Sequence, residues 1–344
     1  MKNKLKMSNS NEEMLKLEMK KGLGTTVNSA NIFDFVKDSY KLKSDKLIMG
    51  ELTWKFLVRN VLRGENVLLV GPAGSAKTMA AHCVVESLKR PFFNIPLGST
   101  QDPRASLIGN THYSKDKGTY FAESYFVNAI RTPNAVVLLD ELSRAHPEAW
   151  NILMPVLDST QRYLRLEEKE DSATVPVADG VSFIATANIG NEYTSTRVLD
   201  RALIDRFTIV EVSPLNADEE FNLLKGIYPE VNEGELKKVA EISYATRREA
   251  RSENSKLSTS ISTRASVKLA ALLKDGFTLM EASEVSILPF FSDAGGVDSE
   301  RTFIKQILQK HCGEIPKDEN LNDKDTLFTA DEINAAAASA STAV

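Results

Sequence analysis

The chain has 344 residues, of which 42% are hydrophobic and 26% are charged, and its formal net charge is −5 at pH 7. This length allows two domains with buried cores plus tails, whereas the small negative charge disfavours a non-specific pull towards nucleic acid or an anionic membrane. No apolar stretch approaches the roughly 20 residues of a membrane-spanning helix, and no secretory signal follows the basic N-terminus, so we expect a cytoplasmic protein with no membrane segment.

The segment 1–44 is polar and weakly patterned, with short helical candidates at 12–21 and 31–40, and predicts an N-terminal extension. A helix is predicted over 53–63, because apolar residues recur there at helical spacing and a glycine follows as a helix end signal. The apolar run NVLLV at 66–70 is too short for a helix and precedes Gly-Pro, which is typical of a buried parallel strand.

Further apolar runs of the same kind follow, and segments with helical spacing separate them. These runs are 91–96, 135–139, 181–187 and 207–212. The alternation predicts an α/β domain over 45–213, in which a parallel sheet is covered by helices to form three layers.

After Pro214 the pattern changes to helices alone, which predicts a smaller all-α lid domain over 214–312. Asn216, with Glu219 three residues later, forms a capping-box-like start. The helical candidates are 217–227, 233–246, 263–275, 279–288 and 299–311, and the charged stretch 247–256 is predicted as a loop. The segment 313–344 carries seven acidic and two basic residues and ends in AAAASASTAV, so it predicts a solvated tail.

The run GPAGSAKT follows the first predicted strand and opens a helix. It predicts a phosphate-binding loop (P-loop), because backbone N–H groups wrap phosphate oxygens while the helix N-terminus adds its positive dipole end. The expected ATP-binding residues are Gly71, Pro72, Ala73, Gly74, Ser75, Ala76, Lys77 and Thr78. Lys77 would reach the β- and γ-phosphates, and the Thr78 hydroxyl would ligate Mg²⁺.

Ala76 stands where the general P-loop pattern has its second glycine. Alanine suits the start of a helix, provided that this residue has a negative φ. On this mismatch alone, a chance glycine-rich turn is the alternative interpretation.

The predicted strand 135–139 delivers two adjacent carboxylates, Asp140 and Glu141, at its C-terminal end, where ligands sit in open parallel sheets. Asp140 would bind ATP-associated Mg²⁺ through water, and Glu141 would orient and polarise the attacking water. An exposed acidic pair is the alternative, but it is uncommon after an apolar strand that follows a P-loop.

The predicted strand 181–187 is followed by Asn188, whose amide could hydrogen-bond the γ-phosphate or the lytic water. The run LDRALIDRF then places Arg201 and Arg206 before the next strand. An arginine here could neutralise charge on the transferring phosphoryl group. Taken singly, the asparagine could start a turn and either arginine could be a surface cation.

Together these segments resemble the MoxR-type AAA+ ATPases, and within them the CbbQ/NorQ and CobS-like branch. The resemblance rests on GPAGSAKT, VVLLDELSRAHPEAWNILMPVLD, FIATAN, LDRALIDRF and the later STRAS, and covers roughly residues 45–290. It implies Walker A and Walker B roles for the loop and for the acidic pair. Alanine before the P-loop lysine is normal in this group.

The resemblance also implies a sensor 1 role for Asn188 and a sensor 2 role for Arg264, which opens a lid helix. Arg206 becomes the arginine finger that acts on a neighbouring subunit's nucleotide, with Arg201 as a second candidate. Because such a finger works between subunits, the family implies a homo-oligomeric ring, commonly a hexamer.

The segment 98–125 matches the place where these ATPases carry an insertion that faces the ring pore or a partner. Tyr113, Lys115, Lys117 and Tyr120 would then contact a substrate, although an ordinary solvated hairpin or loop explains the segment equally well. The segment 163–177 resembles the hairpin that precedes sensor 1 in this family, and it carries no catalytic signature.

The sequence therefore predicts an ATPase that remodels or activates a protein partner. The resemblance adds a partner with a von Willebrand factor A domain, and a role in metal insertion or cofactor maturation. The main alternative is a nucleic-acid-directed motor such as a helicase, translocase or clamp-loader-like ATPase, which the acidic charge disfavours. A P-loop kinase or transferase is a third possibility, but it would need an acceptor pocket.

Overall fold

The computed structural model describes residues 29–312, except for residue 117, residues 170–172 and residues 189–196. The helix expected at 12–21, Lys117 and the tail 313–344 lie outside the described residues. The described chain begins with α2 (Ser29–Asp38), which packs beside α3 (Glu51–Leu62). The buried indole of Trp54 on α3 donates a hydrogen bond to the Ser39 carbonyl oxygen at 2.9 Å and joins the two segments.

A parallel sheet with strand order β2-β5-β8-β1-β9 forms the centre of the first part of the chain. Its strands are β1 (Val67–Val70), β2 (Phe92–Pro96), β5 (Val136–Asp140), β8 (Ser182–Ala187) and β9 (Thr208–Glu211). Each corresponds to one of the predicted apolar runs, with small differences at the ends. These runs carry apolar side chains on both faces because helices cover both faces.

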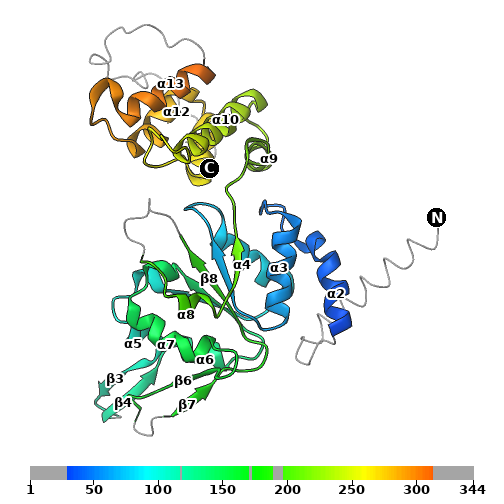
Figure 1. The fold of residues 1–344 in the computed structure, drawn as a ribbon, viewed down its shortest axis with the longest axis vertical. Coiled ribbons are helices and arrows are strands. Elements are labelled where there is room, and N and C mark those ends of the chain that lie inside the picture. The colour runs from blue at the N-terminus through cyan, green and yellow to red at the C-terminus, as the bar shows by residue number, and fades with distance from the viewer. Residues whose placement is uncertain (1–28, 117, 170–172, 189–196, 313–344) are drawn as a thin grey trace, which may run out of the picture.

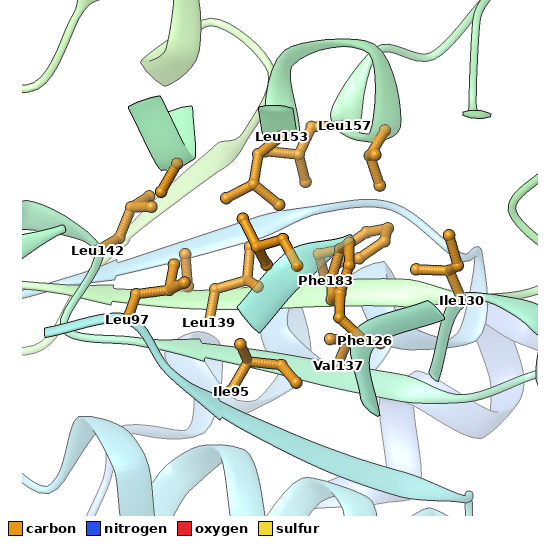
Figure 2. Packing of buried hydrophobic residues seen from close by; sticks show 14 of the residues in the cluster. Ile95, Leu97, Phe126, Ile130, Val137, Leu139, Leu142, Leu153, Leu157 and Phe183 are labelled. Carbon is orange, nitrogen blue, oxygen red and sulfur yellow. The ribbon is translucent and has the colours of Figure 1, made fainter. Parts of the chain in front are cut away.

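The strand β5 shows how the two faces are filled. Val137 and Leu139 pack into the core beneath α6 (Tyr125–Arg131) and α7 (Pro147–Leu157), as Figure 2 shows. The alternate side chains, Val136 and Leu138, pack into the core beneath α3 and α4 (Lys77–Leu88). The predicted three-layer α/β architecture is therefore confirmed.

The helices that follow β9 share a hydrophobic core of their own. They are α9 (Ala217–Ile227), α10 (Glu233–Ala250), α11 (Thr263–Lys274), α12 (Leu279–Ser286) and α13 (Glu300–Cys312). Figure 1 shows them as a separate group, joined to the sheet by the segment after β9. The capping box of Asn216 and Glu219 is confirmed.

One prediction about these helices is wrong in part. The stretch 247–256 is predicted as a loop because of its charge, and residues 251–256 do lie outside helices, but α10 continues to Ala250. The reason is that Arg247 turns inward, where it is only 6% exposed and pairs with Glu220 of α9.

Two antiparallel hairpins extend from the sheet. The first, between α5 (Pro103–Leu107) and α6, consists of β3 (Gly109–Ser114) and β4 (Gly118–Glu123). The second consists of β6 (Tyr163–Arg165) and β7 (Thr174–Pro176), as the sequence predicts.

Candidate nucleotide-binding site

The predicted P-loop connects the end of β1 to the start of α4, which begins at Lys77. A Cβ atom on Gly71 would lie 2.3 Å from the Val212 carbonyl oxygen, so only glycine fits there. Gly74 has a φ of 78°, and a Cβ there would lie 3.0 Å from the Ser262 Cβ. The loop is thus packed closely against the segment after β9 and the start of α11.

Ala76 does not have the negative φ that would make alanine well suited to the start of a helix. Its φ is 62°, which lies in the left-handed region, and Ala76 is the residue directly before α4. This conformation costs about 1–2 kcal/mol for a residue with a Cβ, because the Cβ crowds the following carbonyl oxygen. The general motif places glycine at this position for that physical reason.

The Lys77 side chain turns back over the loop and is almost fully buried. Its ammonium donates hydrogen bonds to the carbonyl oxygens of Gly71 at 2.9 Å and Pro72 at 2.8 Å, and to Asn188 Oδ1 at 2.8 Å. Burial lowers the pKa of Lys77 to about 8, the nearby Asp140 charge partly opposes this shift, and Arg264 adds to it. Lys77 therefore stays largely protonated at pH 7 but loses its proton at a lower pH than an exposed lysine does.

Asp140 lies at the end of β5, between two hydroxyl groups. Its Oδ1 accepts a hydrogen bond from Thr78 Oγ1 at 3.0 Å and from Thr186 Oγ1 at 2.6 Å. Thr186 also accepts a hydrogen bond from the Glu141 backbone N–H at 2.9 Å. Sequence reasoning missed Thr186, because a threonine inside a strand has no distinctive signal.

Glu141 follows Asp140 with a φ of 58°, in the left-handed region. Both carboxylate oxygens lie 3.3 Å from Arg144 Nη1. A Cβ on Gly98 would lie 2.2 Å from Glu141 Oε2, so the carboxylate occupies space that a side chain at position 98 would fill. Position 98 therefore requires glycine for this arrangement of Glu141.

Asn188 follows β8, at the edge of the sheet where β1 and β5 also end. Its amide oxygen accepts from Lys77, and its backbone N–H donates to Ser143 Oγ at 3.3 Å. The parallel register thus brings Lys77, Thr78, Asp140 and Asn188 together from three strand ends, as the sequence predicts.

A cavity of about 900 Å³ lies between the P-loop and the C-terminal helices. Its lining includes Gly71–Ser75, Val212–Pro214, Arg247, Ser258–Thr263 and Phe290. Among the described residues, the buried Ser75 hydroxyl has no hydrogen-bond partner. The cavity lining therefore combines backbone and hydroxyl groups with a few apolar side chains, which is typical of a small-ligand site.

The three predicted arginines lie in different places. Arg264 is exposed near the start of α11, and its positive charge contributes to the lowered pKa of Lys77. Arg201 is exposed at the start of α8 (Arg201–Ile204). Arg206 is half-buried, and its guanidinium donates hydrogen bonds to Asp158 Oδ2 at 3.1 Å and to the Met154 carbonyl oxygen at 3.2 Å.

Within the described residues, no cluster of three or more His, Cys, Asp and Glu side chains could hold a metal ion. The candidate donors are the Thr78 hydroxyl and the Asp140 carboxylate, which are oxygen ligands suited to Mg²⁺ bound together with substrate phosphates. In that same part of the chain, no helix has both the length and the apolar character needed to cross a membrane.

Comparison with known proteins agrees with this geometry. Residues 66–207 match the family model of the AAA domain, dynein-related subfamily. The matched residues run from just before β1 to just before β9 and include the P-loop, Asp140 and Asn188. Over these residues the chain is similar to AAA domains, which agrees with the parallel sheet and the P-loop described above.

Individual relatives share only limited sequence identity with this chain. BssE of Thauera aromatica, which is named as a chaperone, is 29% identical over 266 residues, or 77% of this chain and 85% of BssE. The mitochondrial Lon protease homolog of Schizosaccharomyces pombe is 27% identical over 55% of this chain, but this covers only 17% of that protein. A RuvB mutant of Thermotoga maritima superposes with a TM-score of 0.46 at 15% identity, over 68% of each chain.

Proposed function

We propose that this protein is an AAA+ ATPase of MoxR type, which binds and hydrolyses Mg-ATP in a ring and thereby remodels or activates a protein partner. The observation that carries the proposal is the convergence of Lys77, Thr78, Asp140 and Asn188 beside the P-loop. These groups come from the ends of three strands, and they meet at the edge of the sheet where ligands of open parallel sheets bind.

The residues fit a nucleotide. Gly71 and Gly74 leave no room for side chains, so the backbone is free to approach phosphate oxygens closely. The unpartnered Ser75 hydroxyl and the ammonium of Lys77 are donors on that same loop. The residues 71–78 would hold the phosphates, and the cavity beside the C-terminal helices would hold the base and ribose.

The Thr78 hydroxyl would hold Mg²⁺ directly, and Asp140 would hold it through water. When bound, the ion neutralises charge that develops on the transferring phosphoryl group. Thr186 orients the Asp140 carboxylate through its hydroxyl hydrogen bond, and this leaves Oδ2 of Asp140 available for the water shell.

In the hydrolytic step, Glu141 accepts a proton from the water that attacks the γ-phosphate. Its carboxylate is held by Arg144 in the described conformation, so it must leave that arginine to reach the water. Asn188 would orient the water or the γ-phosphate. Its present contact with Lys77 shows that the asparagine lies within reach of the phosphate-binding lysine.

In a ring, the lid and the neighbouring subunit would each add an arginine to the nucleotide site. Arg264 would bring positive charge to the nucleotide from the lid, and Arg206 of one subunit would reach the nucleotide of the next, with Arg201 as the second candidate. The exposed hairpin of β3 and β4 supports a protein client, because the Tyr113 side chain on it is 76% exposed and that of Tyr120 is 40% exposed. BssE of Thauera aromatica is named as a chaperone, which agrees with such a client, and a von Willebrand factor A domain protein is the partner that we propose.

The nature of the client is tested by affinity capture with the Glu141→Gln variant in the presence of Mg-ATP. We expect this variant to retain a specific protein, which ADP releases. The Lys77→Ala variant, which should not bind ATP, serves as the control. Recovery of DNA or RNA in place of a protein would instead establish a nucleic-acid motor.

The pKa of Lys77 gives a second prediction. Since burial lowers this pKa to about 8, the free protein loses the ammonium above that pH, and the affinity for ATP should fall by up to about tenfold per pH unit there. Calorimetric titration between about pH 7 and pH 10 measures this dependence. The Lys77→Arg variant keeps its charge throughout and should show a flat profile; an equally flat wild-type profile would contradict the prediction.

A further inference from the structure

The C-terminal helices contain an ion pair that the proposed chemistry does not use. Arg247 of α10 pairs with Glu220 of α9, and the two side chains are 6% and 0% exposed. Removing two charges from water is costly, and apolar residues of similar size often stabilise a core as well or better. Stability alone is therefore a weak explanation for this pair.

Arg247 uses every N–H group that its guanidinium has. Its Nε donates to the Ile261 carbonyl oxygen at 2.9 Å, and Nη1 donates to the Leu215 carbonyl oxygen at 3.0 Å and to Glu220. Its Nη2 donates to the other Glu220 oxygen at 2.9 Å and to Thr263 Oγ1 at 3.3 Å. One side chain thus joins the segment after β9, α9, α10 and the start of α11.

These contacts lie at the cavity beside the P-loop. Arg247, Ile261 and Thr263 belong to the cavity lining. Between the last two lies Ser262, which caps α11 through a hydrogen bond from the Ala265 N–H and packs against Gly74 of the P-loop. Arg264, whose positive charge helps to lower the pKa of Lys77, is the residue after Thr263.

We propose that Arg247 is a positioning residue for the nucleotide site. It fixes the segment after β9 to the start of α11, so that Ser262 and Arg264 stand over the P-loop. Glu220 supplies the bidentate partner that holds the guanidinium plane, and the carbonyl oxygens of Leu215 and Ile261 set its position. Lysine lacks this planar fork of five donors and could not hold all four segments together.

This inference rests on the proposed function, and both are tested by the binding of a non-hydrolysable ATP analogue, adenylyl imidodiphosphate, with magnesium. Arg247→Met should lower both the midpoint of thermal unfolding and the affinity, because it strands the buried Glu220 carboxylate. The double variant Glu220→Leu with Arg247→Met removes that charge. It should recover the unfolding midpoint but keep an affinity roughly tenfold below wild type, because the positioning contacts are still missing.

If the double variant does not fold, Arg247→Lys also separates the effect on stability from the effect on affinity. It keeps a charge opposite Glu220 and should unfold near the wild-type temperature, yet it should bind the analogue about tenfold more weakly. The matched control is Arg248→Met, at the exposed next position of α10, which should change neither quantity.

Wild-type affinity in Arg247→Lys, or recovery of both stability and affinity in the double variant, would show that the pair is merely structural and would overturn the inference alone. A wild-type chain that does not bind the analogue would overturn the proposed function as well. The two failures are therefore distinguishable.

Discussion

The Glu141→Gln variant is expected to bind ATP as tightly as the wild-type protein, while its rate of hydrolysis falls by about 10²–10⁴-fold. Glutamine keeps the size of the side chain and an oxygen that could orient water, but it does not accept the proton. The Asp140 network with Thr78 and Thr186 does not include the Glu141 side chain, so the part of the site that holds the nucleotide should be unaffected.

Phosphate release under saturating Mg-ATP measures the rate, and equilibrium titration measures the binding. Glu167→Gln is the matched control, because it makes the same change in charge at an exposed position and should preserve turnover. Persistent turnover in Glu141→Gln would mean that another group activates the water. Loss of ATP binding would mean that Glu141 belongs to the binding site instead.

The sequence predicts the sheet of this protein well. Each central strand is a short apolar run that is buried on both faces, so its position is visible without knowledge of its neighbours. Because parallel strands end at one edge, the same pattern predicts that Lys77, Asp140 and Asn188 meet, and they do. What these residues do with a nucleotide remains a prediction until it is measured.

Other features depend on packing that no local pattern shows. Thr186 looks like an ordinary strand residue, and only the register of β8 beside β5 brings its hydroxyl to Asp140. Arg247 lies in a charged run that is typical of a solvated loop, yet its partner Glu220 is on a different helix. The backbone of Ala76 follows the requirement of the loop rather than the preference of alanine.

The position of Arg206 has a consequence for assembly. Its carbonyl oxygen accepts a hydrogen bond from Asn66 at 3.0 Å, and Asn66 precedes β1 whereas the P-loop follows it. Five residues of extended strand span roughly 16 Å, so Arg206 lies at the opposite end of β1 from the nucleotide site of its own chain. Its guanidinium is also bound to the end of α7 through Asp158. If Arg206 assists hydrolysis, it must therefore act on another subunit.

The Arg206→Ala variant alone should lose turnover by about 10³–10⁵-fold, the usual contribution of an arginine finger. Mixing it with Glu141→Gln subunits should restore part of the activity. In such a ring, an Arg206→Ala subunit retains its own Glu141 and receives Arg206 from its neighbour. Phosphate release, measured as the ratio of the two inactive variants is changed at constant total protein, should pass through a maximum.

Two controls separate this effect from damage to the fold. Asp158→Asn breaks the ion pair with Arg206 but keeps the arginine and its hydrogen bond to the Met154 carbonyl oxygen, so it should lower the unfolding midpoint no more than Arg206→Ala does and should retain turnover. Arg201→Ala, mixed in the same way, tests the second candidate. If only the Arg201→Ala mixtures recover activity, the finger is Arg201. If neither mixture recovers activity, each site works without an arginine from its neighbour, and catalysis gives no reason for a ring.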